Sequence, residues 1–218
     1  MKVEITALKY AESTFPEWLI FEGGRKDVSL PISFIVYLIK TGKSMILVDA
    51  GCENMDGFDM KYFTSPKNIL KRLDINPKDI DHVIITHPHH DHVQATYLYE
   101  NAIIHIEKEA FEEGKKYIPD NFSVNIFEDE NVLDGCVRVK KIGGHCDGSC
   151  IVIANEYVIA GDECYSLKSI EEKIPTGAAQ YPEKNIKFVE EYSKSCYKVL
   201  SCHDSRILPG ENGYIKIV

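Results

Sequence analysis

A short apolar strand that ends in a cluster of histidines and a carboxylate constrains this chain more than any other feature. Residues 83–86 read Val-Ile-Ile-Thr, and His-Pro-His-His-Asp-His follows directly. β-Branched residues favour a rigid strand, and side chains on the turn beyond it are held in place while they face solvent. His87 and His89 are two positions apart and point the same way in extended backbone, whereas Asp91 and His92 lie past the bend. The pattern predicts a metal site, with Asp91 and His92 placed to serve a second ion.

Length and charge limit the class of protein. The 218 residues suffice for one α/β domain with a full core, and we expect a single domain over residues 1–218. The net charge of −9, from 34 acidic and 25 basic residues, repels phosphate backbones, so nucleic acid is not expected as a partner. The first residues lack a continuous apolar region, and the longest apolar run, residues 32–39, is far short of the roughly 20 that span a bilayer. We expect a cytoplasmic protein with no membrane partner.

The seven cysteines show no paired spacing of the Cys-x-x-Cys kind. An odd number without such spacing is typical of reduced thiols in a reducing compartment. Cys136, Cys196 and Cys202 are interpreted as small, buried apolar side chains.

Strand and helix patterns alternate along the chain, which indicates a layered α/β fold. Residues 2–9 predict a first strand, followed by a loop through Pro16, and the apolar run 31–40 predicts a strand buried on both faces. The polar and aromatic residues 51–65 are expected to form a loop that overhangs a pocket, and a helix is expected to begin at Ser65. Further strands are predicted at 45–48, 102–106, 124–127, 136–142, 149–154, 157–160, 198–202 (an inner strand) and 214–218 (a sheet edge), and helices at 92–98, 108–116 and 182–195, the last with Ile186, Val189, Tyr192 and Cys196 on its apolar side.

Other predicted strands also end in ligand-type residues, namely His145, Asp162 and His203. A lone histidine at a strand end usually has a structural role, but five imidazoles and two carboxylates together form the set that two divalent ions require. Zinc is the expected metal, and iron or manganese suits the same donors. Asp49 ends its strand where it either orients a ligand or caps the turn at Gly51. The two glycines before His145 are expected to permit a close backbone approach or a positive φ.

Over nearly its whole length the sequence resembles the metallo-β-lactamase superfamily. The matching landmarks are residues 47–51, 86–92, 144–145, 161–162 and 203. The resemblance implies a four-layer αββα sandwich, the metallo-β-lactamase fold, with metals at one edge between the two sheets. It further implies that His87, His89 and His145 bind one metal, that Asp91, His92 and His203 bind the other, and that Asp162 bridges both.

Within the superfamily, residues 162–165, 171–175 and the pair 203–204 are most similar to the N-acyl-homoserine lactonases. In that family the tyrosine three residues after the bridging aspartate reaches the substrate carbonyl, which implies that Tyr165 is an electrophilic helper. The implied activity is a metal-dependent hydrolysis that opens a lactone with a metal-bound hydroxide as the nucleophile. Asp91 is expected to carry the proton to the leaving alkoxide.

The chain also departs from the lactonase pattern. The loop after Gly51 is shorter than in typical lactonases, where it helps to form the acyl pocket, so the substrate stays open. Gly143-Gly144-His145 stands where the family commonly has Pro-Gly-His. Cys146 and Cys164 are expected near the metals without acting as ligands.

Other functions remain open alongside the lactonase hypothesis. A glyoxalase II-type thioesterase uses the same metals on a hydroxyacyl thioester, but no extra C-terminal helical region is present to hold the glutathione moiety. A phosphodiesterase or RNase of the superfamily is disfavoured by the acidic charge. A diiron reductase would carry glutamate where this chain has His89, and a non-catalytic metal-binding protein is a further alternative. We expect a small-molecule substrate. The oligomeric state stays open, and a homodimer is one of the alternatives.

Overall fold

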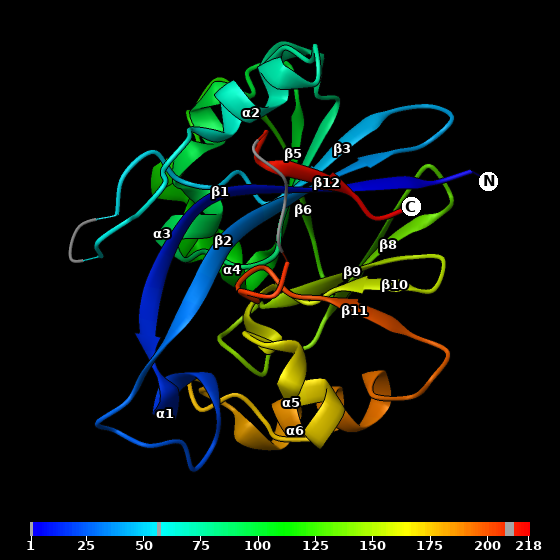
Figure 1. Ribbon diagram of the computed structural model, residues 1–218. Helices are drawn as coiled ribbons and strands as arrows, with labels where there is room; N and C mark the ends of the chain where they lie inside the picture. The colour runs from blue at the N-terminus through cyan, green and yellow to red at the C-terminus, as the bar shows by residue number, and fades with distance from the viewer. Residues whose placement is uncertain (1, 56–57, 208–211) are drawn as a thin grey trace.

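Two β-sheets face each other between two layers of helices in the computed structural model, which describes residues 2–55, 58–207 and 212–218 (Figure 1). Among these residues the first sheet has the order β12 (Tyr214–Lys216), β1 (Glu4–Pro16), β2 (Ser29–Lys40), β3 (Met45–Val48), β4 (His82–Ile85), β5 (Ile103–Glu107) and β6 (Ser123–Phe127). The second sheet has the order β11 (Lys198–Leu200), β10 (Tyr157–Ile159), β9 (Cys150–Ala154), β8 (Val137–Lys141) and β7 (Glu130–Leu133).

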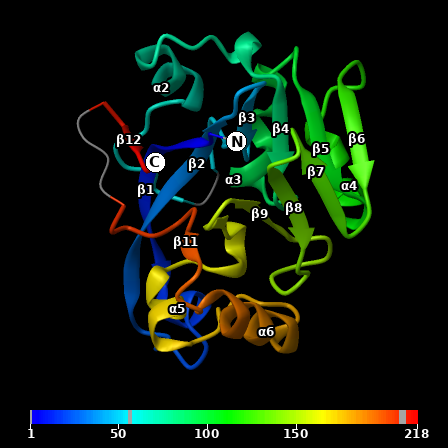
Figure 2. The same cartoon turned by 90° about the vertical axis from the view of Figure 1, so that its right-hand side faces the viewer.

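The helices cover the outer faces of the two sheets (Figure 2). On the first sheet lie α2 (Pro66–Arg72), α3 (His90–Val93) and α4 (Lys108–Gly114), and on the second lie α5 (Leu167–Glu172) and α6 (Pro182–Tyr192). The short α1 (Glu17–Ile20) follows β1, and 3-10 turns form η1 (Pro77–Asp79), η2 (Gln94–Leu98), η3 (Lys115–Tyr117) and η4 (Gly161–Glu163). This arrangement confirms the predicted αββα sandwich.

Strand β2 shows why the layers stack in this way. Its apolar run has no polar face, so successive side chains bury on opposite sides of the sheet. Val36 and Leu38 pack with the helices that cover the first sheet, whereas Tyr37 and Ile39 pack between the sheets. A third apolar cluster lies between the second sheet and α6, where Phe188 contributes from the helix. The three clusters correspond to the three interfaces of a four-layer fold.

Strand β1 is longer than predicted. It continues to Pro16, through residues expected to form a loop, because residues 11–16 pair antiparallel with 29–34 of β2 beyond a bulge at residues 9–11. The polar residues of this half disguise the strand in the sequence, since their partners are distant along the chain. The extension brings Phe15 to the mouth of the site described below.

Several smaller predictions were wrong. Helix α6 ends at Tyr192 and buries Asn185 and Phe188, so Ile186 and Cys196, expected on its apolar side, are exposed. Cys136 is only half-buried, whereas Cys202 is buried as predicted. Strand β11 lies at the edge of its sheet instead of inside it, and the expected edge position of β12 is confirmed. Helix α5 and strand β7 were not predicted.

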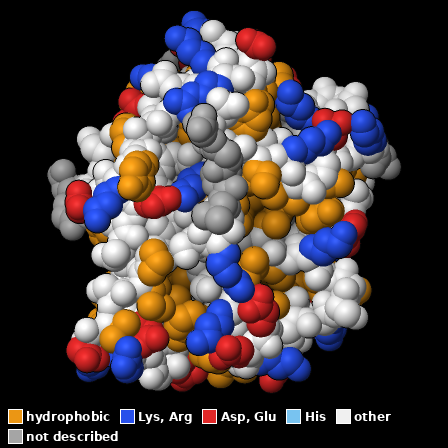
Figure 3. Space-filling view, viewed as in Figure 1, with side chains coloured by type: hydrophobic (Ala, Val, Ile, Leu, Met, Phe, Trp, Pro, Cys, Tyr) orange, Lys and Arg blue, Asp and Glu red, His pale blue; other side chains and the backbone are white. Residues whose placement is uncertain are grey.

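The surface is mixed in charge. On the face shown in Figure 3, side chains of Lys and Arg are interspersed with those of Asp and Glu, and apolar side chains lie between them. Within the described part of the chain, every helix is too short or too polar to cross a bilayer.

Candidate metal centre

The histidine motif lies at the carboxyl ends of neighbouring parallel strands. Strands β3, β4 and β5 run parallel, so the residues that follow β3 and β4 meet at one edge of the sheet. The chain bends at Thr86 and His87 after β4, is extended at His89 and enters α3 at His90. Asp49, which follows β3, adopts a left-handed conformation with φ 65° and turns its carboxylate towards the motif.

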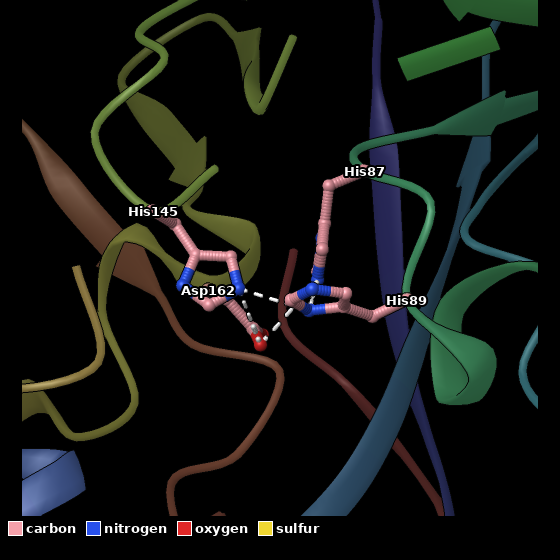
Figure 4. Close-up of side chains that lie close together, drawn as sticks. All are labelled: His87, His89, His145 and Asp162. Carbon is pink, nitrogen blue, oxygen red and sulfur yellow. Dashed lines mark hydrogen bonds and ion pairs between the residues drawn. The ribbon is translucent and has the colours of Figure 1, made fainter. Parts of the chain in front are cut away.

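The second sheet contributes the other three predicted ligands. His145 follows β8, Asp162 lies in η4 after β10, and His203 follows β11. Figure 4 shows His145 and Asp162 approaching from one side while His87 and His89 approach from the other. The structure therefore brings together all seven residues predicted as ligands, from both sheets.

The two glycines before His145 act as expected. Gly143 has a φ of +66°, which a side chain would make unfavourable. Gly144 lies so close to the neighbouring backbone that a Cβ atom would be 2.9 Å from the amide nitrogen of Asn185. Glycine at both positions lets the loop after β8 turn sharply and present the imidazole of His145.

Four of the residues form what we call the three-histidine cluster: His87, His89, His145 and Asp162. The Nδ1 atom of His89 lies 3.1 Å from Nε2 of His87 and 3.0 Å from Nε2 of His145. The Oδ2 atom of Asp162 lies 3.4 Å from Nε2 of His87 and 3.5 Å from that of His145. Three ring nitrogens and one carboxylate oxygen thus surround a single point, the donor set of a tetrahedral zinc site.

Three more residues form the Asp91 cluster: Asp91, His92 and His203. The Oδ2 atom of Asp91 lies 3.4 Å from Nε2 of both His92 and His203. The other carboxylate oxygen of Asp162, Oδ1, lies 3.1 Å from Nε2 of His92 and 3.0 Å from that of His203. Asp162 therefore faces each cluster with a different oxygen.

Hydrogen bonds fix the rings of the Asp91 cluster. Nδ1 of His92 donates to Oδ2 of Asp49 at 2.8 Å, and Nδ1 of His203 donates to the backbone carbonyl of Ser33 at 2.9 Å. Since each Nδ1 is committed as a donor, Nε2 is the nitrogen left to bind a proton or a metal. In both rings Nε2 faces the cluster.

Asp49 also reaches the three-histidine cluster, through Thr86. The backbone N–H and the hydroxyl of Thr86 donate to Asp49 at 2.8 and 3.0 Å. The same hydroxyl oxygen, 3.1 Å from Nδ1 of His87, accepts from that ring and leaves its Nε2 free. The expected orienting role of Asp49 is thus supported by contacts to both clusters, one direct and one through Thr86.

The two clusters differ in how readily their rings take up a proton. In the three-histidine cluster, burial lowers the pKa of His87 to about 3 and that of His145 well below its usual value. In the Asp91 cluster burial acts in the same direction, but the carboxylates of Asp91 and Asp162 outweigh it and raise the pKa of His92 and of His203. Burial alone would raise the pKa of both carboxyl groups, yet the neighbouring imidazoles hold it below the usual range.

The donor set fits divalent metal ions. Nε2 of His92, Nε2 of His203 and Oδ1 of Asp162 are buried and have no hydrogen-bond partner among the described residues. Buried polar atoms without partners are costly, and here the two ring nitrogens converge on the carboxylate oxygen at 3.1 and 3.0 Å. A cation between them would satisfy all three.

Tyr165 and an apolar wall complete the site. The hydroxyl of Tyr165 donates to Oδ2 of Asp162 at 2.7 Å, and burial together with that carboxylate raises its pKa well above the usual value, so it remains a donor. The ring lies stacked between those of Phe15 and His203, at centroid distances of 5.5 and 5.1 Å. A cavity of about 370 Å³ opens here, and its apolar lining is Phe15, Ile32, Phe34, Met55, Phe58 and Ala178.

Met55 and Phe58 line the cavity, which supports the expectation that the loop after Gly51 overhangs a pocket. Residues 56–57 of this loop lie outside the described residues. Phe15 was missed, since it lies in a segment predicted as a loop, and nothing in its local sequence indicates the site. Among the cysteines, Cys146 and Cys164 belong to neither cluster of ligand atoms in the described chain, whereas Cys202 lies 3.9 Å from Oδ2 of Asp49.

A second cavity of about 400 Å³ adjoins the first, and Tyr165 and His203 line both. Its lining combines apolar side chains, such as Ile20 and Phe21, with charged ones, among them Lys168, Glu172 and Arg206. The second cavity thus adds charged groups to the site beyond Tyr165.

Comparison with protein families matches residues 36–162 to the metallo-beta-lactamase superfamily. A probable metallo-hydrolase of Methanocaldococcus jannaschii is 29% identical over 130 residues, which cover 60% of this chain and 56% of the relative. An N-acyl homoserine lactonase of a Bacillus species is 27% identical over 168 residues, 64% of this chain and 67% of the relative. The chain thus spans little more than half the length of the archaeal relative.

Solved structures show the same fold. An N-acyl homoserine lactone hydrolase, with N-hexanoyl-L-homoserine bound at its catalytic metal centre, matches with a TM-score of 0.84 at 20% identity. The match covers 99% of this chain and 100% of that one. A probable metal-dependent hydrolase from Staphylococcus aureus matches with a TM-score of 0.79 at 21% identity, over 94% and 91% of the two chains.

Proposed function

The chain belongs to the metallo-β-lactamase superfamily, and from this premise we propose that it is a hydrolase with two divalent metal ions that opens a lactone of the N-acyl-homoserine type. The observation that carries the proposal is the pair of donor clusters that share Asp162 beside an apolar cavity. The similarity to N-acyl homoserine lactonases supports the substrate class. Zinc is the proposed metal, because imidazole and carboxylate donors at these positions suit it.

In this proposal the three-histidine cluster holds one ion, the Asp91 cluster holds the other, and Asp162 serves both. Bound metal ions at such a site polarise a carbonyl oxygen and lower the pKa of water towards neutrality. The protein contributes fixed ring orientations, through Asp49 and Thr86, and a wall that limits the entry of water.

Tyr165 and Asp91 are the proposed catalytic residues. Both line the cavity, so both can contact a bound ester. The hydroxyl of Tyr165, kept protonated by its raised pKa, donates to Asp162 in the structure and would turn to donate to the oxyanion that forms as the carbonyl is attacked. Asp91, an ionised carboxylate at the cavity, would accept the proton that the attacking water loses and pass it to the leaving alkoxide.

The cavity supports an amphiphilic substrate. Aromatic and aliphatic side chains such as Phe34, Met55 and Phe58 form one side, where an acyl chain would be removed from water. His89, Asp91 and the other ligands form the opposite side, where the ester would lie. Soluble esters with short polar acids would leave the apolar wall exposed and gain less from binding.

The charged groups of the adjoining cavity favour a second candidate, a glyoxalase II-type thioesterase. That cavity offers Lys168, Glu172 and Arg206 to a polar leaving group on the other side of Tyr165. A thioester of a charged peptide would use both cavities, whereas an acyl-homoserine lactone would use mainly the apolar one.

One experiment separates the two candidates. Zinc-loaded protein is mixed with a short-chain and a long-chain acyl-homoserine lactone, with proton release as the readout, and separately with a glutathione thioester, read by loss of its absorbance. We expect lactone opening that His87→Ala abolishes. Thioester cleavage without lactone opening would contradict the proposed substrate, and no turnover on either would favour a metal-binding protein without this activity.

A further inference from the structure

A second carboxylate, that of Glu163, lies directly beside Asp162 but takes no part in either metal cluster. Its side chain is buried, with 1% of its surface exposed. Its Oε1 atom accepts from the backbone N–H of Gly144 at 2.8 Å, from that of His145 at 3.0 Å and from the hydroxyl of Ser149 at 2.7 Å. Its Oε2 atom accepts from the amide of Asn185 at 2.8 Å.

We propose that Glu163 is the positioning residue of the His145 loop, and that it sets the metal affinity of the three-histidine cluster. The inference rests on the proposed metal site. Three of its four donors belong to residues 144–149, the loop that presents His145. The fourth, Asn185, belongs to α6 and anchors the carboxylate from the outer helix layer.

The geometry leaves the carboxylate one arrangement. The amide of Asn185 also donates to the backbone carbonyl of Glu163 at 3.0 Å, and its oxygen accepts from the N–H of Thr176 at 2.9 Å, so this amide cannot be flipped without losing both contacts. On the other side, the Cβ atom of an alanine at position 144 would lie 2.4 Å from Oε2 of Glu163. The side chain is therefore fixed between α6 and the His145 loop.

Only a carboxylate satisfies this set of donors. Each oxygen of Glu163 faces a donor, and a glutamine in its place would turn its NH₂ group either towards Asn185 or towards the N–H groups of Gly144 and His145. Either orientation opposes donor to donor in a buried site, which is costly. The simplest relief is a shift of the loop, and a shift of the loop moves the imidazole of His145 away from His89 and Asp162.

The test is a metal titration of Glu163→Gln. Wild-type protein, E163Q and H145A are titrated with Co²⁺ in competition with a chromophoric chelator, and the visible d–d absorption reports the coordination of each equivalent. We expect one equivalent to bind about 10- to 100-fold more weakly in E163Q, the effect typical of removing a partner that orients a ligand. The Co²⁺ equivalent weakened in E163Q should be the one that H145A abolishes. The other Co²⁺ equivalent should keep its wild-type affinity in E163Q.

The matched control is Val158→Ala. Val158 is buried in the apolar cluster between the second sheet and α6, to which Phe188 also belongs. Its side chain makes no hydrogen bond to the site, because it carries no polar atom. It should lower Tm without changing either Co²⁺ affinity. Unchanged affinities in E163Q, or equal weakening in V158A at an equal loss of Tm, would overturn the positioning role and leave a purely structural one.

A second variant covers the case in which E163Q does not fold. Ser149→Ala keeps the carboxylate but removes one of the loop's donors to it, and should weaken the same equivalent. Normal binding by S149A would overturn the inference. The titration needs no substrate, so a protein that binds Co²⁺ but opens no lactone contradicts only the proposed function. A wild type that binds no Co²⁺ overturns both.

Discussion

The two donor clusters use the same kinds of residue but place them in different surroundings. In the three-histidine cluster, burial dominates and keeps His87 and His145 neutral, ready to bind a metal. In the Asp91 cluster, carboxylates dominate and favour the protonated form of His92 and His203. A metal must therefore displace protons from His92 and His203 to bind at the Asp91 cluster. It can bind the neutral rings of His87 and His145 without displacing a proton. The balance between desolvation and nearby charge, and not residue type, distinguishes the two sites.

The largest expected effect comes from removing the group that both clusters share. Asp162→Asn replaces one of two opposed acceptor oxygens with an amide, so metal should be lost from both clusters. Turnover should fall at least about a thousandfold, because bound metals contribute several kcal/mol to such reactions. Metal content by mass spectrometry and lactone turnover check this. Retention of one full equivalent would show that the clusters bind independently.

A more selective break is Asp91→Asn. Among the described residues, the ion pairs of this carboxylate are those with the rings of its own cluster, His92 and His203. We expect loss of most turnover with retention of the metal in the three-histidine cluster, since its donors are untouched. Metal stoichiometry and kcat, measured on one preparation, decide the outcome. Undiminished kcat would remove the proton-carrying role of Asp91.

Asp49 tests whether one residue orients rings in both clusters. Asp49→Asn should weaken metal binding at both by about 10- to 100-fold, as is usual when the partner of a ligand histidine is lost. Thr86→Val is the matched variant, because it removes the hydroxyl that links Asp49 to His87 but keeps the direct bond between Asp49 and His92, and should weaken only the three-histidine cluster. If Asp49→Asn and Thr86→Val weakened the binding of both metals equally, Asp49 would not act directly on one cluster and through Thr86 on the other.

Tyr165→Phe should cost activity without releasing metal. Its hydroxyl is an expected donor to the oxyanion, and its loss should lower kcat by about 10- to 100-fold, a little less than the loss of a well-aligned oxyanion donor. Metal content should stay at the wild-type level, because the hydroxyl contacts Asp162 without being one of the clustered ligand atoms. Full activity of the variant would exclude the proposed role.

The smallest expected effect is the pH dependence of metal binding, which tests the difference between the two clusters most directly. The pKa of His92 and of His203 is raised, so protons compete with metal at the Asp91 cluster as the pH falls through these raised values, above the usual 6.5 of histidine. The pKa of His87 and of His145 is lowered, so these two rings bind protons only at lower pH. Stepwise Co²⁺ release should therefore empty the Asp91 cluster first. Simultaneous release would contradict the comparison.

Local sequence predicted the half of the site that comes from the first sheet. His87, His89, Asp91 and His92 lie within six residues of one another, and their spacing after an apolar strand needs no knowledge of the rest of the chain. His145, Asp162 and His203 come from three separate strands of the second sheet, and only their combination, together with the family resemblance, linked them to the motif. Their meeting depends on sheet topology, which short-range patterns do not contain.

The residues that sequence reasoning missed act through distant contacts. Phe15 reaches the cavity because the polar half of β1 pairs with β2, and neither its composition nor its spacing indicates a strand. Glu163 is one of many glutamates in the sequence, and its importance appears only when the His145 loop and α6 are seen around it. The layered α/β class was predictable from the alternation of strand and helix patterns, and the αββα order followed from the family resemblance. Strand lengths and the position of β11 depended on pairing partners.

The division of ligands between the two sheets has a consequence for the way the molecule opens. The first sheet supplies four of the donors and the second supplies three, so bound ions would act as cross-links across the interface between them. Separation of the sheets would then require release of the ions, and the amide protons of β4 and β10 would exchange with solvent only in a shared, cooperative event. Removal of the metals would leave the apolar cluster between the sheets as the contact that joins them, and would speed the exchange of both strands.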